Sequence, residues 1–164
     1  MWMFLAIAAL AGPPSVAVQS DGSVIGTAEL DVSAEVIRAN LSDPLWLPTV
    51  DGGGTVVVVE GTEGPCLRLK STSPSSVMTV KYRTKRCPTS TGFRSTLIDS
   101  NAFKSYTTSW VFKDIGNGKS TATYTIMANS SLWVPEGIVR RQTRLGIERM
   151  LTNVQAWSVT QGQK

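Results

Sequence analysis

The 164-residue sequence contains no histidine. Histidine is the commonest general base and a common metal ligand, so its absence excludes every histidine-containing catalytic triad. Only two cysteines are present, which argues against a structural or catalytic zinc site. We therefore predict no metal and no cofactor.

Paired carboxylates for acid–base chemistry are also lacking. The acidic residues at strand positions that would face inward are Glu29, Asp31, Glu60 and Asp99, and no two of them form an evident acid–base pair. The glycine run at residues 52–54 lacks the Lys-Ser or Lys-Thr of a phosphate-binding loop and is typical of a hairpin connection. We predict no catalytic residue, and enzymatic activity stays poorly supported by the sequence.

Charge is not concentrated in one sign. The chain has 16 Lys and Arg against 12 Asp and Glu, a formal net charge of +4. This charge is too small and too scattered to indicate nucleic-acid binding, but it favours transient contact with an anionic membrane. A basic outer face, whose simplest role is solubility, is predicted from Arg68, Lys70, Lys81, Arg83, Lys85 and Arg86.

Long apolar runs are absent apart from the N-terminal segment, residues 1–12, which carries no charge. Ser15 and Ala17 then fit the small-residue pattern that signal peptidase reads. We predict that residues 1–17 are a leader cleaved after Ala17 and that residues 18–164 form one domain, secreted or located in the periplasm or a lumen. The apolar run is shorter than a transmembrane helix; an uncleaved anchor is the alternative.

The cysteines form an even pair in a chain that is predicted to leave the cytosol, which favours a Cys66–Cys87 disulfide. Cys66 alternates with Arg68, and Cys87 alternates with Lys85, so both would lie on the polar face of adjoining strands. A tight turn at residues 73–76 would set Cys66 opposite Arg83 instead. The disulfide therefore requires a bulge or a looser turn.

The rest of the chain reads as strands with a few helical segments. Ser33 is a candidate N-cap for a short helix over residues 34–41, and an Asn117-Gly118 pair indicates a tight hairpin. Residues 45–48 form an apolar knuckle, and a long amphipathic helix is predicted from 136 to about 157. Alternation predicts strands over residues 23–31, 55–60, 65–71, 77–86, 93–100, 105–114 and 119–128.

The order of these elements resembles that of the START-like superfamily, which joins START lipid-transfer domains, polyketide cyclases and pollen-allergen-type ligand carriers. The similarity rests on residues 32–48, on the late strands around 109–112 and 123–126, and on residues 133–139 before the last helix. It implies an α+β helix-grip fold. In that fold a curved antiparallel sheet of about six to seven strands surrounds a long C-terminal helix, with a short helix pair after the first strand.

The resemblance also implies a cavity between the sheet and the terminal helix. Each candidate lining residue has an ordinary core role as its alternative. The candidates are Tyr82, Trp110, Phe112, Tyr124, Val139, Thr143, Gly146, Ile147 and Met150.

We predict an exported monomer that binds a lipid or another small hydrophobic ligand in this cavity. The alternatives are a cyclase- or hydrolase-like enzyme on the same fold and a non-catalytic interaction protein whose cavity is filled by its own side chains.

Overall fold

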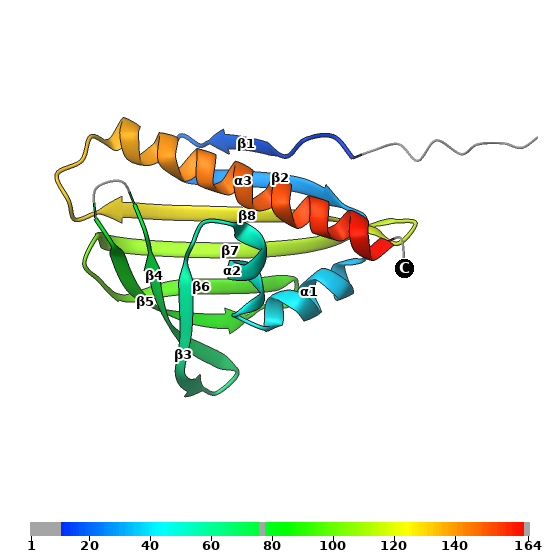
Figure 1. Cartoon of the computed structure of the whole chain (residues 1–164), viewed down its shortest axis with the longest axis horizontal. Helices are drawn as coiled ribbons and strands as arrows, with labels where there is room; N and C mark the ends of the chain where they lie inside the picture. The colour runs from blue at the N-terminus through cyan, green and yellow to red at the C-terminus, as the bar shows by residue number, and fades with distance from the viewer. Residues whose placement is uncertain (1–10, 76–77, 163–164) are drawn as a thin grey trace, which may run out of the picture.

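The protein is a single curved antiparallel sheet with three helices on one face, shown by a computed structural model that describes residues 11–75 and 78–162 (Figure 1). The eight strands follow the order β1-β2-β8-β7-β6-β5-β4-β3. The strands are β1 (Ser15–Val18), β2 (Val24–Leu30), β3 (Val56–Glu63), β4 (Cys66–Ser73), β5 (Val80–Pro88), β6 (Gly92–Ser100), β7 (Phe103–Gly116) and β8 (Lys119–Ser130). The helices are α1 (Ala34–Ser42), α2 (Trp46–Asp51) and α3 (Glu136–Gly162).

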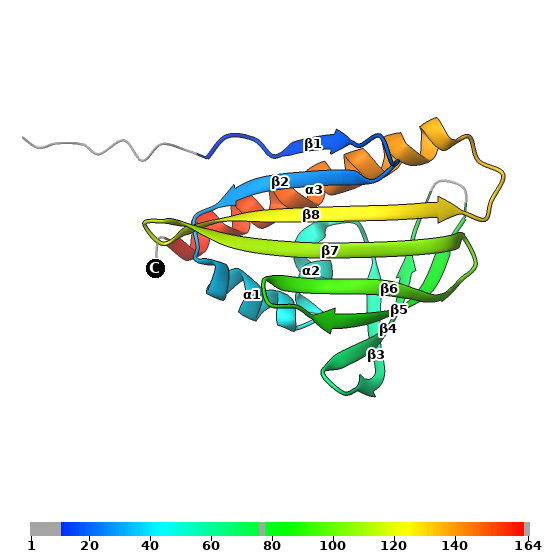
Figure 2. The ribbon, with the colours of Figure 1, turned by 180° about the vertical axis from the view of Figure 1, so that it is seen from behind.

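The predicted helix-grip architecture is confirmed. Helix α3 runs along the sheet and packs on β2 and β1, while α1 and α2 form the expected helix pair after β2. Figure 2 shows the opposite face of the sheet, which no helix covers. The sheet therefore has one helix-covered face and one open face, as the alternation of apolar and polar residues indicates.

Local signals explain several element ends. Ser33 caps α1, and its Oγ accepts a hydrogen bond of 3.3 Å from the backbone N–H of Val36. The β7–β8 hairpin turns at Asn117 and Gly118, which both adopt positive φ, 54° and 71°. The apolar knuckle of the sequence is the helix α2, which ends at Gly52 with a left-handed φ of 71°.

Strand β1 lies where the sequence predicts a leader. Ser15–Val18 pairs with β2, and the carbonyl of Gly12 accepts a hydrogen bond from Gln155 of α3. The first ten residues of the predicted leader lie outside the described residues. Cleavage after Ala17 stays a prediction, and it would remove three of the four residues of β1.

The hydrophobic core fills the space where α1 and the C-terminal half of α3 meet the sheet. Leu30, Ile37, Leu41, Leu151 and Val154 have no exposed surface. Such dense apolar contact supplies most of the stability of a domain of this size.

The predicted disulfide between Cys66 and Cys87 is present. Leu67 pairs with Arg86 across β4 and β5, so the next positions outward bring the two cysteines opposite each other. The last paired positions of β4 and β5 are Ser73 and Val80. This register differs from the one that a tight turn at residues 73–76 would give, which would set Cys66 opposite Arg83.

Candidate functional site

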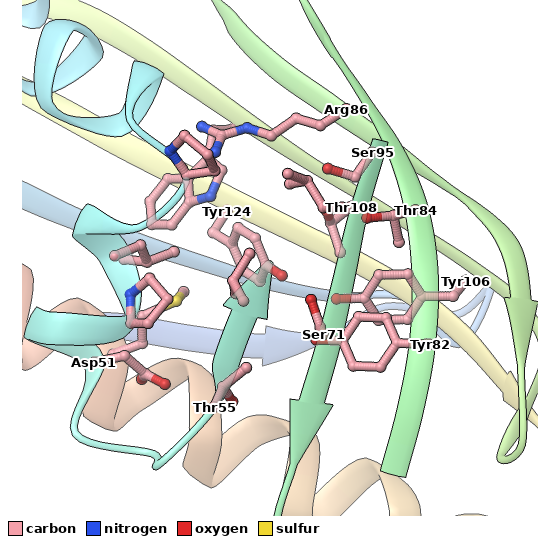
Figure 3. Close-up of a pocket in the computed structure, with 17 residues that line it drawn as sticks. Asp51, Thr55, Ser71, Tyr82, Thr84, Arg86, Ser95, Tyr106, Thr108 and Tyr124 are labelled. Carbon is pink, nitrogen blue, oxygen red and sulfur yellow. The ribbon is translucent and has the colours of Figure 1, made fainter. Parts of the chain in front are cut away.

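A cavity of about 200 Å³ lies between α2 and the inner face of strands β3 to β8 (Figure 3). Apolar side chains close it on the helix side, including Leu47 of α2 and Met150 of α3. Six strands contribute inward side chains to the other wall because every second residue of a strand points to the same face. The site is therefore built from segments that lie far apart in the sequence.

Tyrosine rings form the centre of the wall. The chain contains three tyrosines, and all of them, Tyr82, Tyr106 and Tyr124, line the cavity. The ring centroids of Tyr82 and Tyr106 are 5.3 Å apart, and those of Tyr124 and Trp110 are 4.7 Å apart. These distances are typical of attractive aromatic pairs, so the rings form a connected surface against which a planar molecule would pack.

The hydroxyls of Tyr106 and Tyr124 stay protonated. Burial, followed by its interactions with Tyr124 and Tyr82, raises the pKa of Tyr106 well above its ordinary value. Burial also raises the pKa of Tyr124 to about 12. Both side chains therefore offer neutral hydroxyl groups at physiological pH, and these can donate or accept a hydrogen bond.

Smaller hydroxyls extend this polar lining. Ser71, Thr84 and Thr108 are each at least 94% buried and face the cavity from β4, β5 and β7. Polar groups in such positions are unfavourable in a plain apolar core unless they find partners. Their presence makes the wall mixed, with hydroxyls set among aromatic rings.

Arg86 is the cation of the cavity. It lies at the end of β5, and its guanidinium carbon is 4.3 Å from the ring centroid of Phe93. Its Nη2 donates a hydrogen bond to the carbonyl oxygen of Leu41, in the last turn of α1. Burial lowers the pKa of Arg86 to about 10, so the guanidinium is still charged at neutral pH.

Asp51 is the carboxylate of the cavity. Its Oδ1 is buried and accepts no hydrogen bond from the described residues, although Arg149 Nη2 lies 3.5 Å away at an ion-pair distance. The backbone carbonyl of Asp51 accepts hydrogen bonds from Arg149 and Asn153 of α3, which fix α2 against that helix. Asp51 is thus held in place by its backbone while one carboxylate oxygen is left without a donor.

The structure brings together some of the predicted lining residues and separates others. Tyr82, Trp110, Tyr124 and Met150 line the cavity. Thr143, Gly146 and Ile147 border a second hollow of about 200 Å³ beside α3, which shares Asp51, Tyr124 and Met150 with the first. Val139 borders two other spaces at the start of α3, of about 260 Å³ and about 20 Å³. Phe112 lies in the hydrophobic core, stacked on Trp110 with a centroid distance of 5.7 Å.

Several polar residues of the site differ from what the sequence predicts. Arg86 belongs to the predicted basic outer face, but this prediction is wrong, because Arg86 shares the inner face of β5 with Tyr82 and Thr84. Strict alternation from Tyr82 would have placed it correctly, because Arg86 is an even number of residues away. Asp51 carries no such signal, since its position depends on how α2 packs against α3.

The strand carboxylates named as inward candidates lie in ion pairs instead. Arg83 binds Glu60 at 3.0 Å and Asp99 at 3.2 Å. Lys119 binds Asp31 at 2.9 Å and is 3.7 Å from Glu29. None of these four carboxylates lines the cavity.

Comparison with solved structures supports the fold. A START superfamily protein from Mycobacterium smegmatis superposes with a TM-score of 0.74 at 14% identity, covering 84% of this chain and 97% of that one. An aromatase/cyclase from a Streptomyces species gives a TM-score of 0.69 at 9% identity, covering 86% and 93%. A major latex-like protein from Panax ginseng gives 0.58 at 11% identity, covering 92% and 99%.

No family model matches the sequence, and no curated protein matches it. The solved structures show that the chain has the helix-grip fold that START-like proteins share. Because the sequence identities are low, this comparison shows the fold alone.

Proposed function

We propose that the protein binds one small, largely apolar ligand in the cavity between α2 and the inner face of the sheet. The observation that carries this proposal is the mixed lining: three tyrosines and buried hydroxyls surround about 200 Å³ that the protein's own side chains leave open. Apolar rings would drive binding by leaving water, and the hydroxyls would set the ligand's orientation. The helix-grip fold adds support, because the START-like resemblance implies hydrophobic ligands.

Binding of the neutral fluorophore N-phenylnaphthylamine tests the proposal, with its fluorescence rising as it leaves water. A matched pair of variants on β6 gives the control. Ser95 lines the cavity, whereas Thr96 beside it is exposed and points the other way. We expect Ser95→Phe to fill the cavity and abolish binding and Thr96→Phe to leave binding unchanged. Equal binding by both variants, each shown to be folded by circular dichroism, would contradict the proposal.

An enzyme at the same site is the second candidate, and Asp51 favours it. A carboxylate oxygen without a donor, beside neutral tyrosine hydroxyls, is a group that can take a proton from a bound ligand. If so, Asp51→Asn should abolish turnover of a candidate substrate while leaving its binding intact. Loss of binding and turnover together would assign Asp51 to binding alone.

We also propose export, since a disulfide persists in oxidising compartments. Among residues 11–75 and 78–162, no helix is long and apolar enough to cross a membrane.

Transient contact with an anionic membrane is supported by two exposed apolar residues near the arginines of α3. Trp133 is fully exposed, and Ile138 lies close to those arginines. We expect Trp133→Ser to weaken co-sedimentation with phosphatidylserine vesicles, and unchanged co-sedimentation would oppose the contact.

A further inference from the structure

Arg86 differs from the other cations of its strand in what surrounds it. Arg83 and Lys85 point to the open face of the sheet, where Glu60, Asp99 and Glu63 pair with them. Arg86 points to the helix-covered face and lines the cavity. Among the described residues, no carboxylate forms an ion pair with its guanidinium within 4.0 Å, and Asp43 acts on it only as a more distant electrostatic attraction.

A helix cap accounts for only part of the Arg86 side chain. The carbonyl of Leu41 is one of the carbonyls that α1 leaves unpaired at its C-terminus, and Arg86 Nη2 donates to it. The Phe93 ring covers one face of the guanidinium. A guanidinium carries five N–H donors in a planar fork, and among the described residues Leu41 accepts the one hydrogen bond found. The remaining donors suit a bidentate carboxylate.

The opposite side of the cavity disfavours a second negative charge. Figure 3 shows Arg86 and Asp51 on opposite sides of the pocket, with Tyr124 between them and with Tyr82 and Tyr106 along the strand wall. The Asp51 carboxylate already pairs with Arg149 at 3.5 Å, so a ligand anion beside Asp51 would be repelled by that carboxylate and would compete with it for one cation. The charge arrangement therefore favours a ligand with one anionic group, at the Arg86 end, and a neutral body among the tyrosine rings.

The size of the cavity limits that neutral body. An apolar cavity of about 150 Å³ is large enough to hold benzene, and this cavity has about 200 Å³. One aromatic ring or two fused rings fit this space, and the adjoining hollow of about 200 Å³ beside α3 has room for a further ring such as the phenyl group of N-phenylnaphthylamine. The two acyl chains of a phospholipid exceed the cavity. The rings of Tyr82, Tyr106 and Tyr124 offer the flat contacts that such a ligand requires.

We propose that the ligand is an aromatic monocarboxylate of one or two rings, whose carboxylate pairs with Arg86 and whose ring packs among the three tyrosines. This inference rests on the proposed binding function and specifies the class of ligand. The carboxylate replaces the water that Arg86 loses on burial, so the charged form of the ligand binds better than an uncharged isostere.

Displacement of N-phenylnaphthylamine by naphthoate and by naphthamide tests the preference, since the two competitors share a ring system and differ in charge. We expect the wild-type protein to bind naphthoate about 10- to 100-fold more tightly, the usual range for charge-assisted hydrogen bonds. Arg86→Gln should lose this preference and still bind the neutral fluorophore. Arg83→Gln is the matched control, because it removes the same charge from the open face of β5, and it should keep the preference.

The outcomes separate the two proposals. If the fluorophore does not bind the wild-type protein, the binding function itself fails. If it binds and the two competitors displace it equally, the cavity binds ligands but Arg86 serves only as the cap of α1, and this inference is overturned. Should Arg86→Gln fail to fold, Arg86→Lys keeps the charge without the planar fork, and we expect it to retain a weaker preference for naphthoate. The wild-type comparison decides the question in either case.

Discussion

The two halves of the space beneath α3 are filled in opposite ways. In the C-terminal half, Leu151, Val154 and Ser158 have no exposed surface and pack against β2 and α1. In the middle of the helix, nothing lies within 4 Å of the position that a Cβ on Gly146 would occupy. One helix and one sheet thus make a packed region and a hollow region, and the difference lies in the side chains that project between them.

The packed region contains aliphatic side chains that interlock. A Cβ on Gly26 would come within 2.4 Å of Ile147 and 2.6 Å of Leu151, so glycine lets the helix approach the sheet closely. The hollow region is lined instead by tyrosines and short hydroxyl side chains. The stability of the fold therefore comes mainly from the packed region. Side chains of the hollow region can be substituted without unfolding the protein.

Removing a packed side chain should give the largest effect. Leu151→Ala leaves a cavity in the packed region, and we expect it to lower the free energy of unfolding by about 3 kcal/mol. Urea denaturation followed by circular dichroism measures the change. Leu145→Ala, on the exposed side of the same helix, is the control and should change stability by less than about 0.5 kcal/mol. Similar losses for both variants would remove the distinction between the two faces.

The pH at which the tyrosines ionise reports on the hollow region. Because the pKa of Tyr124 is raised from 10.0 to about 12, the folded protein holds this proton more tightly than the unfolded chain does. The stability that this difference gives is complete below about pH 10 and is lost as the pH rises through about 12.

Phenolate absorbance measures that ionisation. In a Tyr82→Phe variant the signal comes from Tyr106 and Tyr124 alone. We expect both tyrosines to ionise at a higher pH in the folded protein than in protein unfolded in urea, because burial raises the pKa of each. If the titration curves of folded and unfolded protein coincide, neither hydroxyl is buried, and the two tyrosines do not line the cavity as described.

Adding a methyl group should have opposite effects in the two regions. We expect Gly26→Ala to lower the free energy of unfolding by about 1–3 kcal/mol, because the new Cβ overlaps Ile147 and Leu151. Thermal or urea unfolding measures the loss. A neutral result would mean that α3 can move away from β2 without penalty.

Gly146→Ala should have the smallest effect and the opposite sign. Gly146 lies inside α3 with open space at its Cβ position. Alanine is favoured over glycine in a helix interior, so we expect the free energy of unfolding to rise by about 0.5–1 kcal/mol. Binding of N-phenylnaphthylamine should persist in this variant. Destabilisation would indicate that the hollow beside α3 closes in solution.

The sequence predicted the fold more completely than the site. The Ser33 cap, the Asn117-Gly118 hairpin and the long last helix are local patterns, and the structure confirms each of them. Strand β1 was missed because its residues fall in the predicted leader. The ligand-binding roles of the nine named residues stay predictions, and the structure distributes those residues among the cavity, the hollow beside α3, the start of α3 and the core.

The sequence by itself contained the alternation of residues along the strands and the starts of α1 and α3, because these depend on neighbours a few residues away. It also contained the absence of histidine, which removes the commonest acid–base chemistry. Only the tertiary structure decided that Arg86 faces a cavity without an ion-pair partner and that Asp51 lies across from it. The size and lining of the space between helix and sheet depend on how side chains from distant segments pack together, and no local sequence pattern specifies that packing.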